Sequence, residues 1–235
     1  MTDTPLLALP LVQPNQAQKH VTVNEALARL DALVQLRLAS VTLGTPPVPV
    51  AGTAYGVPLG AVNAWAGQGA RVAIAINGGW EFVTPQRGWQ AQVMDAGHRA
   101  IFDGDGWRAG AMSLTAGGAS MAMRSTEIDV TLTPGGTVTT PVVFPARSIV
   151  FGVTGLVTTA ITGSATGWSL GVAADAGQFG TGLGLAQNSW VNGPAAPTVS
   201  WAPMPLIITA TGGSFTGGAV RLVAHFAELA IPDWV

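Results

Sequence analysis

Glycine or proline interrupts almost every apolar run of this chain after residue 44. The 235 residues include 31 Gly and 16 Pro, so that one residue in five is a strong turn former or helix breaker. Such punctuation allows short strands joined by tight turns and disfavours long helices. The sequence therefore predicts a mainly β protein.

Charged side chains are scarce, at 9% of residues against 48% hydrophobic ones; an average globular protein has about 25% charged residues. We expect solubility to depend either on Thr, Ser, Asn and Gln or on apolar surface covered by neighbouring subunits, and we favour the second. The net charge of −2 gives no positive field, which argues against a nucleic-acid partner. The absence of cysteine excludes disulfides and thiolate sites.

Residues 1–14 predict an extended arm, because prolines at positions 5, 10 and 14 prevent a helix there. We expect this arm to lie on a partner protein. It has no basic segment of the kind that begins a secretory signal. Nor does any apolar run approach the roughly 20 residues of a membrane helix. We therefore expect synthesis in the cytoplasm without membrane insertion.

The stretch from Asn15 to Leu43 lacks both Gly and Pro and predicts a helix that Gly44 ends. A capping box at Thr22–Glu25 places its regular start near Thr22, with an earlier turn at Gln16–His20 as an alternative. Its apolar spacing resembles a short coiled-coil seam. The candidate oligomerisation residues are Val23, Leu27, Leu30, Val34 and Val41. The other interpretation is a helix packed on its own domain, and the two remain open.

Residues 45–120 repeat one pattern at Ile74–Phe82 and at Ala100–Arg108: alternating apolar residues, an Asn-Gly or Asp-Gly turn, and then tryptophan. Each predicts a tight β-hairpin. A domain of this size buries little surface, so we expect its aromatic residues to form a compact core rather than a sugar-stacking platform. They are Tyr55, Trp65, Trp80, Trp89 and Trp107.

After a small polar linker at Thr115–Ser120, residues 121–235 predict an antiparallel β-sandwich or jelly roll. Gly177–Gly184 is expected to be a loop, as is Ala186–Pro205. The predicted domains are thus 1–44 (arm and assembly helix), 45–120 (Trp-rich hairpins) and 121–235 (recognition domain). The expected strands of the last domain are 127–132, 138–144, 148–157, 168–173, 205–210 and 220–229.

Residues for catalysis are few. His20, His98 and His225 lie in three different segments, which argues against a metal site. Asp103–Gly106 superficially resembles a calcium loop but fits a hairpin turn better, since the acidic residue that completes such a loop is missing. After Thr133 the chain holds three acids and two arginines, too few for an obvious carboxylate pair. We expect no enzyme, no metal and no cofactor.

The segment from Ala186 to Pro205 combines amides with flat aromatic side chains, a mixture suited to weak glycan recognition. The candidate ligand-binding residues are Gln187, Asn188, Trp190, Asn192 and Trp201. In the alternative interpretation both tryptophans pack under their own loop or against another subunit.

The run LPxxQxxQAQKHVTxNEALxxLDALVQ at Leu9–Gln35 resembles the opening of a family of uncharacterised proteins carried by alphaproteobacterial prophages and gene transfer agents. Further resemblance lies in GAxxAWAG at Gly60–Gly67, GGWxFxxP at Gly78–Pro85 and VFGVTG at Val150–Gly155. The resemblance covers essentially the whole chain. It implies a virion-associated structural role, and for gene transfer agents a head spike that helps the particle adhere to a recipient's capsule.

Together these observations predict a homo-oligomeric spike or fibre protein of a phage-like particle. The arm would contact other virion proteins, and the last domain would bind host-surface polysaccharide. A trimer is the favoured oligomer and a pentamer the alternative. Two other functions stay open: a purely structural adaptor that docks another particle protein, and a polysaccharide depolymerase.

Overall fold

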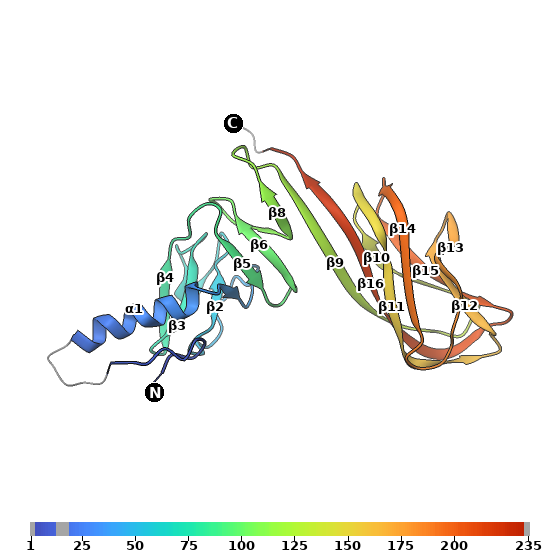
Figure 1. Ribbon diagram of the computed structural model, residues 1–235, viewed down its shortest axis with the longest axis horizontal. Helices are drawn as coiled ribbons and strands as arrows, with labels where there is room; N and C mark the ends of the chain where they lie inside the picture. Colours follow the sequence, from blue (N-terminus) through green and yellow to red (C-terminus); the bar gives the residue numbers. More distant parts are fainter. Residues whose placement is uncertain (1–2, 13–18, 233–235) are drawn as a thin grey trace. The chain divides into compact units, whose positions relative to one another are not determined.

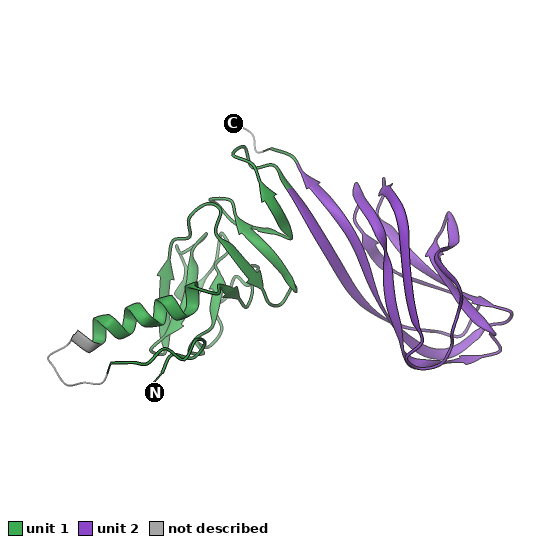
Figure 2. Ribbon diagram, in the orientation of Figure 1, with its two compact units in different colours: residues 1–120, 231–235 green, residues 121–230 purple. Residues whose placement is uncertain are grey.

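The structure, a computed structural model, describes residues 3–12 and 19–232, and for residues 19 and 20 the backbone alone. This part of the chain is mainly β with one α-helix, which confirms the predicted fold class. Two compact units can be distinguished, and they are described one at a time (Figure 2). Unit 1 comprises residues 1–120 and 231–235, and unit 2 comprises residues 121–230.

Unit 1 is built on a seven-stranded sheet with the order β4-β3-β2-β1-β5-β6-β7 (Figure 1). The short strand β1 runs parallel to β2 and β5, and the other neighbours are antiparallel. The strands are β1 (Arg37–Leu38), β2 (Ala54–Gly56), β3 (Val72–Ile76), β4 (Gly79–Val83), β5 (Gln90–Val93), β6 (His98–Phe102) and β7 (Trp107–Ala109), followed by β8 (Ala111–Leu114).

Both predicted hairpins are present. Strands β3 and β4 pair around a two-residue turn in which Asn77 (φ 53°) and Gly78 (φ 74°) are both left-handed. Asn-Gly suits such a turn because both residues tolerate positive φ. Strands β6 and β7 pair around the turn closed by a backbone hydrogen bond from Asp103 N to Gly106 O at 3.0 Å.

The helix α1 (Lys19–Leu33) begins earlier than Thr22 and ends ten residues before Leu43, so its predicted extent is wrong. The chain after it enters the sheet as β1. There Leu38 is fully buried, and its carbonyl oxygen accepts a hydrogen bond from Met94 N at 2.8 Å. Burial of Leu38 between strands outweighs the helical preference of the stretch, and local spacing does not reveal that effect.

The two faces of the sheet carry different cores. Val72 and Ile74 of β3 face the α1 side, where they pack with Ala32 of the helix (Figure 1). Ala73, between them, faces the other side and packs with Trp65 of the short 3₁₀ helix η1 (Asn63–Trp65). Side chains along β3 thus alternate between the two faces of the sheet, and both sets are buried.

The aromatic residues form cores, as predicted. Trp65 is fully buried, with its ring centroid 5.3 Å from that of Tyr55 and 5.1 Å from that of Trp80. On the opposite face Trp89 and Trp107 are partly buried against the α1 core. Tilted and edge-to-face contacts of this kind stabilise aromatic clusters beyond the area they bury.

Residues 3–12 form a closed turn on their own chain, where the sequence predicted an extended arm on a partner. Asp3 and Pro10 form an isolated antiparallel bridge. At the end of the segment, Asn24 of α1 accepts a hydrogen bond from Val12 N (2.9 Å) and donates one to Val12 O (3.1 Å). The bridge therefore closes the segment on itself, and the contacts of Val12 fix its end to α1.

One buried carboxylate holds the middle of the turn. Asp31 of α1 is 2% exposed. Its oxygens accept hydrogen bonds from Thr4 Oγ1 (2.6 Å), Leu6 N (3.0 Å) and Leu7 N (2.6 Å). A buried carboxylate needs several donors, and the turn supplies one hydroxyl and two backbone amides.

Unit 2 has two antiparallel sheets around one core, in agreement with the predicted sandwich. One sheet has the order β10-β15-β12-β13, and the other contains β14-β11-β16-β9. The core between them includes Phe144, Trp168 and Phe226, all 2% exposed or less. The strands are β9 (Ser120–Thr131), β10 (Thr137–Phe144), β11 (Ser148–Gly163), β12 (Gly167–Val172), β13 (Asp175–Leu183), β14 (Trp190–Ser200), β15 (Met204–Thr211) and β16 (Phe215–Ala230).

The sequence predicted loops at 177–184 and 186–205. This prediction is wrong for most of both segments, because they contain β13 and β14. Glycine here allows two strands to lie unusually close together. A Cβ atom on Gly193 of β14 would overlap the carbonyl oxygen of Phe179 of β13. Sequence patterns associate Gly with turns, whereas these glycines let one strand pass close to another.

Candidate functional site

The outward-facing side of the β14-β11-β16-β9 sheet gathers the side chains of unit 2 that are best suited to binding. Trp190 at the start of β14 is 70% exposed and pairs with Leu156 of β11, which is 40% exposed. Two residues along, Asn192 pairs with Thr154. Period-two alternation brings these side chains to one face, and β14 is the edge of the sheet within unit 2.

The structure brings together part of the predicted glycan site. Gln187 and Asn188 are exposed in the loop just before Trp190, and the Gln187 amide donates to Thr158 O at 3.0 Å. Trp201 is 81% exposed but follows the far end of β14. Trp201 lies eleven positions after Trp190 along largely extended chain, a separation of roughly 30 Å. The two tryptophans therefore cannot contact the same sugar ring.

Ion pairs occupy the middle of this face. Arg221 of β16, which pairs with Leu156, makes two 2.8 Å hydrogen bonds to the carboxylate of Asp129 on β9. Glu127 lies 3.5 Å from the same guanidinium. The hydrogen bonds and charge of Arg221 lower the pKa of Asp129, and the two carboxylates raise the pKa of Arg221. Arg221 is thus already paired with carboxylates.

His225 bridges three strands of the same face. Its Nδ1 lies 2.9 Å from Ser125 Oγ of β9, and its Nε2 lies 2.9 Å from Thr154 Oγ1 of β11. Hydroxyls both donate and accept, so either tautomer of the ring is satisfied. His225 therefore has a structural part in the sheet, as the sequence predicted for it, while the side chain of His20 lies outside the described residues.

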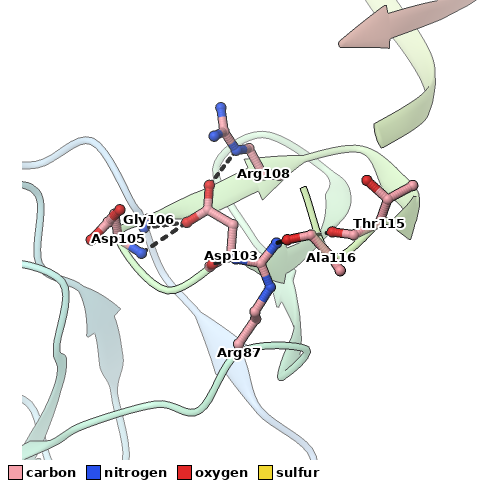
Figure 3. A network of polar contacts seen from close by, with 7 residues as sticks. All are labelled: Arg87, Asp103, Asp105, Gly106, Arg108, Thr115 and Ala116. Atoms are coloured by element: carbon pink, nitrogen blue, oxygen red, sulfur yellow. Dashed lines mark hydrogen bonds and ion pairs between the residues drawn. The ribbon is translucent and has the colours of Figure 1, made fainter. Parts of the chain in front are cut away.

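Asp103 organises a second polar network, in the β6–β7 turn of unit 1 (Figure 3). Its carboxylate accepts hydrogen bonds from Asp105 N (2.9 Å) and Gly106 N (2.7 Å) and forms an ion pair with Arg108. Burial would raise the pKa of Asp103, but the two backbone hydrogen bonds and the Arg108 charge together lower it. These contacts belong to the β6–β7 hairpin turn that the sequence predicted.

Arg87 extends this network to the segment that the sequence predicted as a linker. Its guanidinium donates to the carbonyl oxygens of Asp103 (2.6 Å), Thr115 (2.9 Å) and Ala116 (3.0 Å), as Figure 3 shows. The arginine therefore fixes the small polar segment to the turn. Among residues 3–12 and 19–232, no group of three or more His, Asp or Glu side chains could hold a metal ion.

The predicted oligomerisation seam is only partly helical. Val23 and Leu30 lie on α1, 44% and 51% exposed, with the half-buried Leu27 between them. Val34 follows the helix and is 58% exposed. Val41 lies beyond β1 and packs against the α1 core, so its predicted place on the helix is wrong.

Sequence reasoning did not place these other residues on the same outer face as Trp190: Leu156, Thr154, Arg221 and His225. Alternation within β11 and β16 indicates which residues point outward. It does not show that β11 lies between β14 and β16, which is the information that assembles the surface. Strand pairing over such long separations has no local signature.

Residues 23–108 match the family model described as "Protein of unknown function (DUF2793)". The match begins inside α1 and runs through the sheet of unit 1 to Arg108 in β7. A search of the curated proteins found no significant match. Among solved structures, a chain of the "Cyanophage Pam1 capsid asymmetric unit" is similar to 46% of this chain and to 84% of its own length, with 21% identity and a TM-score of 0.31. That likeness is too weak to indicate a shared fold.

Within the described residues, no helix is long and apolar enough to cross a membrane.

Proposed function

We propose that this chain is a non-catalytic spike or fibre protein on the surface of a phage-like particle, and that unit 2 attaches the particle to polysaccharide on the host cell. The observation that carries the proposal is the outer face of unit 2. Trp190 is 70% exposed there, with Leu156 and Asn192 beside it. A flat aromatic face can stack on a sugar ring, and an adjacent amide can both donate to and accept from its hydroxyls.

The particle context rests on the resemblance of the run at Leu9–Gln35 to proteins of prophages and gene transfer agents. The structure gives a physical role to two residues of that run, since Asn24 and Asp31 fix the N-terminal turn to α1. The turn leaves Leu6 (42%), Leu7 (38%) and Val12 (46%) partly exposed. These side chains are the part of unit 1 that we assign to contacts with other virion proteins.

Self-association is part of the proposal. Val23, Leu30 and Val34 are exposed along the α1 side of unit 1, and the low charge of the chain offers little to solvate such apolar surface. We expect light scattering of the purified full chain at micromolar concentration to give an oligomer, with the trimer favoured and the pentamer as the alternative. A monomeric mass that persists as concentration rises would contradict this part.

Replacement of Trp190 by Ala tests the attachment face. We expect binding of the full chain to purified host capsular polysaccharide to weaken about tenfold per site, the loss of one aromatic stack. In the oligomer the loss of adhesion should be larger, because several sites act together. The measurement is surface-based binding on immobilised polysaccharide, with thermal unfolding to confirm that the fold is intact.

Trp201→Ala is the matched control, since Trp201 is equally exposed but lies at the other end of β14. Its binding should equal that of the unmodified chain. Full binding by Trp190→Ala would move the site elsewhere. A chain that binds no polysaccharide would favour the adaptor, and a fall in polymer length during incubation would favour the depolymerase.

A further inference from the structure

We propose that the attachment face of unit 2 is selective for uncharged polysaccharide, and that two carboxylates paired with Arg221, those of Glu127 and Asp129, exclude acidic sugars. This inference rests on the proposed function, because it names the class of polysaccharide that the same face takes. The contacts of Arg221 carry it, since this cation lies in line with Trp190 across the sheet.

Arg221 lies within reach of a sugar chain that stacks on Trp190. The strands follow one another in the order β14-β11-β16-β9 (Figure 1). Leu156 of β11 pairs with Trp190 on one side and with Arg221 on the other, so all three side chains point to the same face. Because neighbouring strands lie roughly 4.8 Å apart, the Cα atoms of Trp190 and Arg221 are about 10 Å apart. An oligosaccharide on Trp190 can therefore extend over the guanidinium.

An acidic sugar would have to compete for Arg221 with the protein's own carboxylates. The Nε and Nη2 atoms of Arg221 each donate a 2.8 Å hydrogen bond to a different oxygen of Asp129. Oε1 of Glu127 lies 3.5 Å from Nε. Two parallel bonds between guanidinium and carboxylate are a strong arrangement. A carboxylate on the same chain is also present at a high effective concentration, so a uronate would displace it only with difficulty.

The cluster carries an excess of one negative charge, since Arg221 contributes +1 and the two carboxylates −1 each. The side chains of Arg221, Glu127 and Asp129 are 49%, 58% and 63% exposed, so this charge faces solvent. The hydrogen bonds and charge of Arg221 lower the pKa of Asp129, which keeps that carboxylate ionised at neutral pH. A uronate above Leu156 would lie within about one Debye length, roughly 8 Å, of the excess charge and would be repelled.

The other basic side chains of unit 2 do not supply a cation beside Trp190. Unit 2 holds three arginines and no lysine. Arg124 is in an ion pair with a glutamate of β16. Arg147 donates its backbone N–H to the carbonyl oxygen of Ser200, at the far end of β14. Both ring nitrogens of His225 already contact hydroxyl groups.

Hydroxyl groups suit the same cluster. Carboxylate oxygens accept hydrogen bonds from hydroxyls, and guanidinium N–H groups donate to them. The bonds to Asp129 use Nε and Nη2 of Arg221, and Nη1 makes no hydrogen bond within the described residues. An uncharged sugar can therefore bond to both kinds of group without displacing either.

The test compares two forms of purified host capsular polysaccharide that share the same linkages. In one form the carboxyl groups are reduced to hydroxyls, and in the other the primary hydroxyls are oxidised to carboxylates. Binding of the full chain to each immobilised form gives two dissociation constants. We expect the uncharged form to bind at least tenfold more tightly, because the acidic form finds repulsion and no available cation.

The double variant Glu127→Gln with Asp129→Asn removes both negative charges, keeps the side-chain shapes and leaves Arg221 available to uronates. We expect the ratio of the two dissociation constants to shift at least tenfold toward the acidic form. Asp175→Asn is the control, because the exposed Asp175 begins β13 in the other sheet. It also removes one negative charge from unit 2 and should leave the ratio unchanged. Thermal unfolding checks that each variant is folded.

The possible failures can be told apart. Equal or tighter binding of the acidic form by the unmodified chain overturns the selectivity, while the attachment function stands. An unchanged ratio in the double variant, or an equal shift in Asp175→Asn, overturns the part assigned to Glu127 and Asp129. A chain that binds neither form contradicts the attachment function itself, and this inference falls with it.

Discussion

Asp31→Ala should detach the N-terminal turn from unit 1. The change removes the acceptor of three hydrogen bonds, from Thr4 Oγ1, Leu6 N and Leu7 N, and hydrogen bonds to a charged group contribute about 1.5–3 kcal/mol each. The contributions are not additive, because a released turn can bond to water. We expect unit 1 to lose about 2–4 kcal/mol of unfolding free energy and the amides of Leu6 and Leu7 to exchange rapidly with solvent.

Hydrogen exchange and thermal unfolding of the full chain measure both effects. Asp95→Ala is the control, because Asp95 is exposed in the β5–β6 turn and its side chain has no hydrogen bond within the described residues. Continued protection of the Leu6 and Leu7 amides in Asp31→Ala would show that apolar contacts alone hold the turn.

Gly193→Ala should destabilise unit 2 by about 3 kcal/mol or more. A methyl group there would overlap the carbonyl oxygen of Phe179, a backbone atom that cannot move without displacing β13. Overpacking in a tight core costs typically 1–3 kcal/mol, and more where backbone must shift. The measurement is the urea midpoint of unit 2, followed by amide exchange in β12, β13 and β14.

Gly136→Ala provides the comparison. Gly136 also lies in unit 2, but a methyl group on it would meet no atom within 4 Å, and its φ is not left-handed. We expect its midpoint to match or slightly exceed that of the unmodified chain, because Ala restricts the unfolded state. Equal midpoints for the two variants would mean that β13 and β14 do not cross as closely as described.

Local chemistry determined which features could be predicted from the sequence. The Asn77-Gly78 turn has one favourable backbone solution, so the β3–β4 hairpin follows directly from the residue types. The helix was over-extended because the burial of Leu38 depends on β5, more than fifty residues away. Strands β13 and β14 were missed because glycines in this region, such as Gly193 beside Phe179, allow a close approach of strands that no local pattern encodes.

The candidate site, too, could be predicted from the sequence only in part. The residue types that favour stacking were found in the sequence, and Trp190 is exposed as a binding residue must be. The placement of Trp201 at the opposite end of β14 could not be predicted, because the segment was taken for a loop in which the two rings could meet.

The position of β16 has a consequence for synthesis on the ribosome. This last strand of unit 2 lies between β11 and β9 in its sheet. Until β16 has been synthesised and has left the ribosome, β9 and β11 have no partner along those edges, and unpaired edges recruit strands from other molecules. Long-range pairing of this kind also slows folding. Nascent chains that terminate before residue 215 should therefore aggregate, while chains that include β16 can close the sheet.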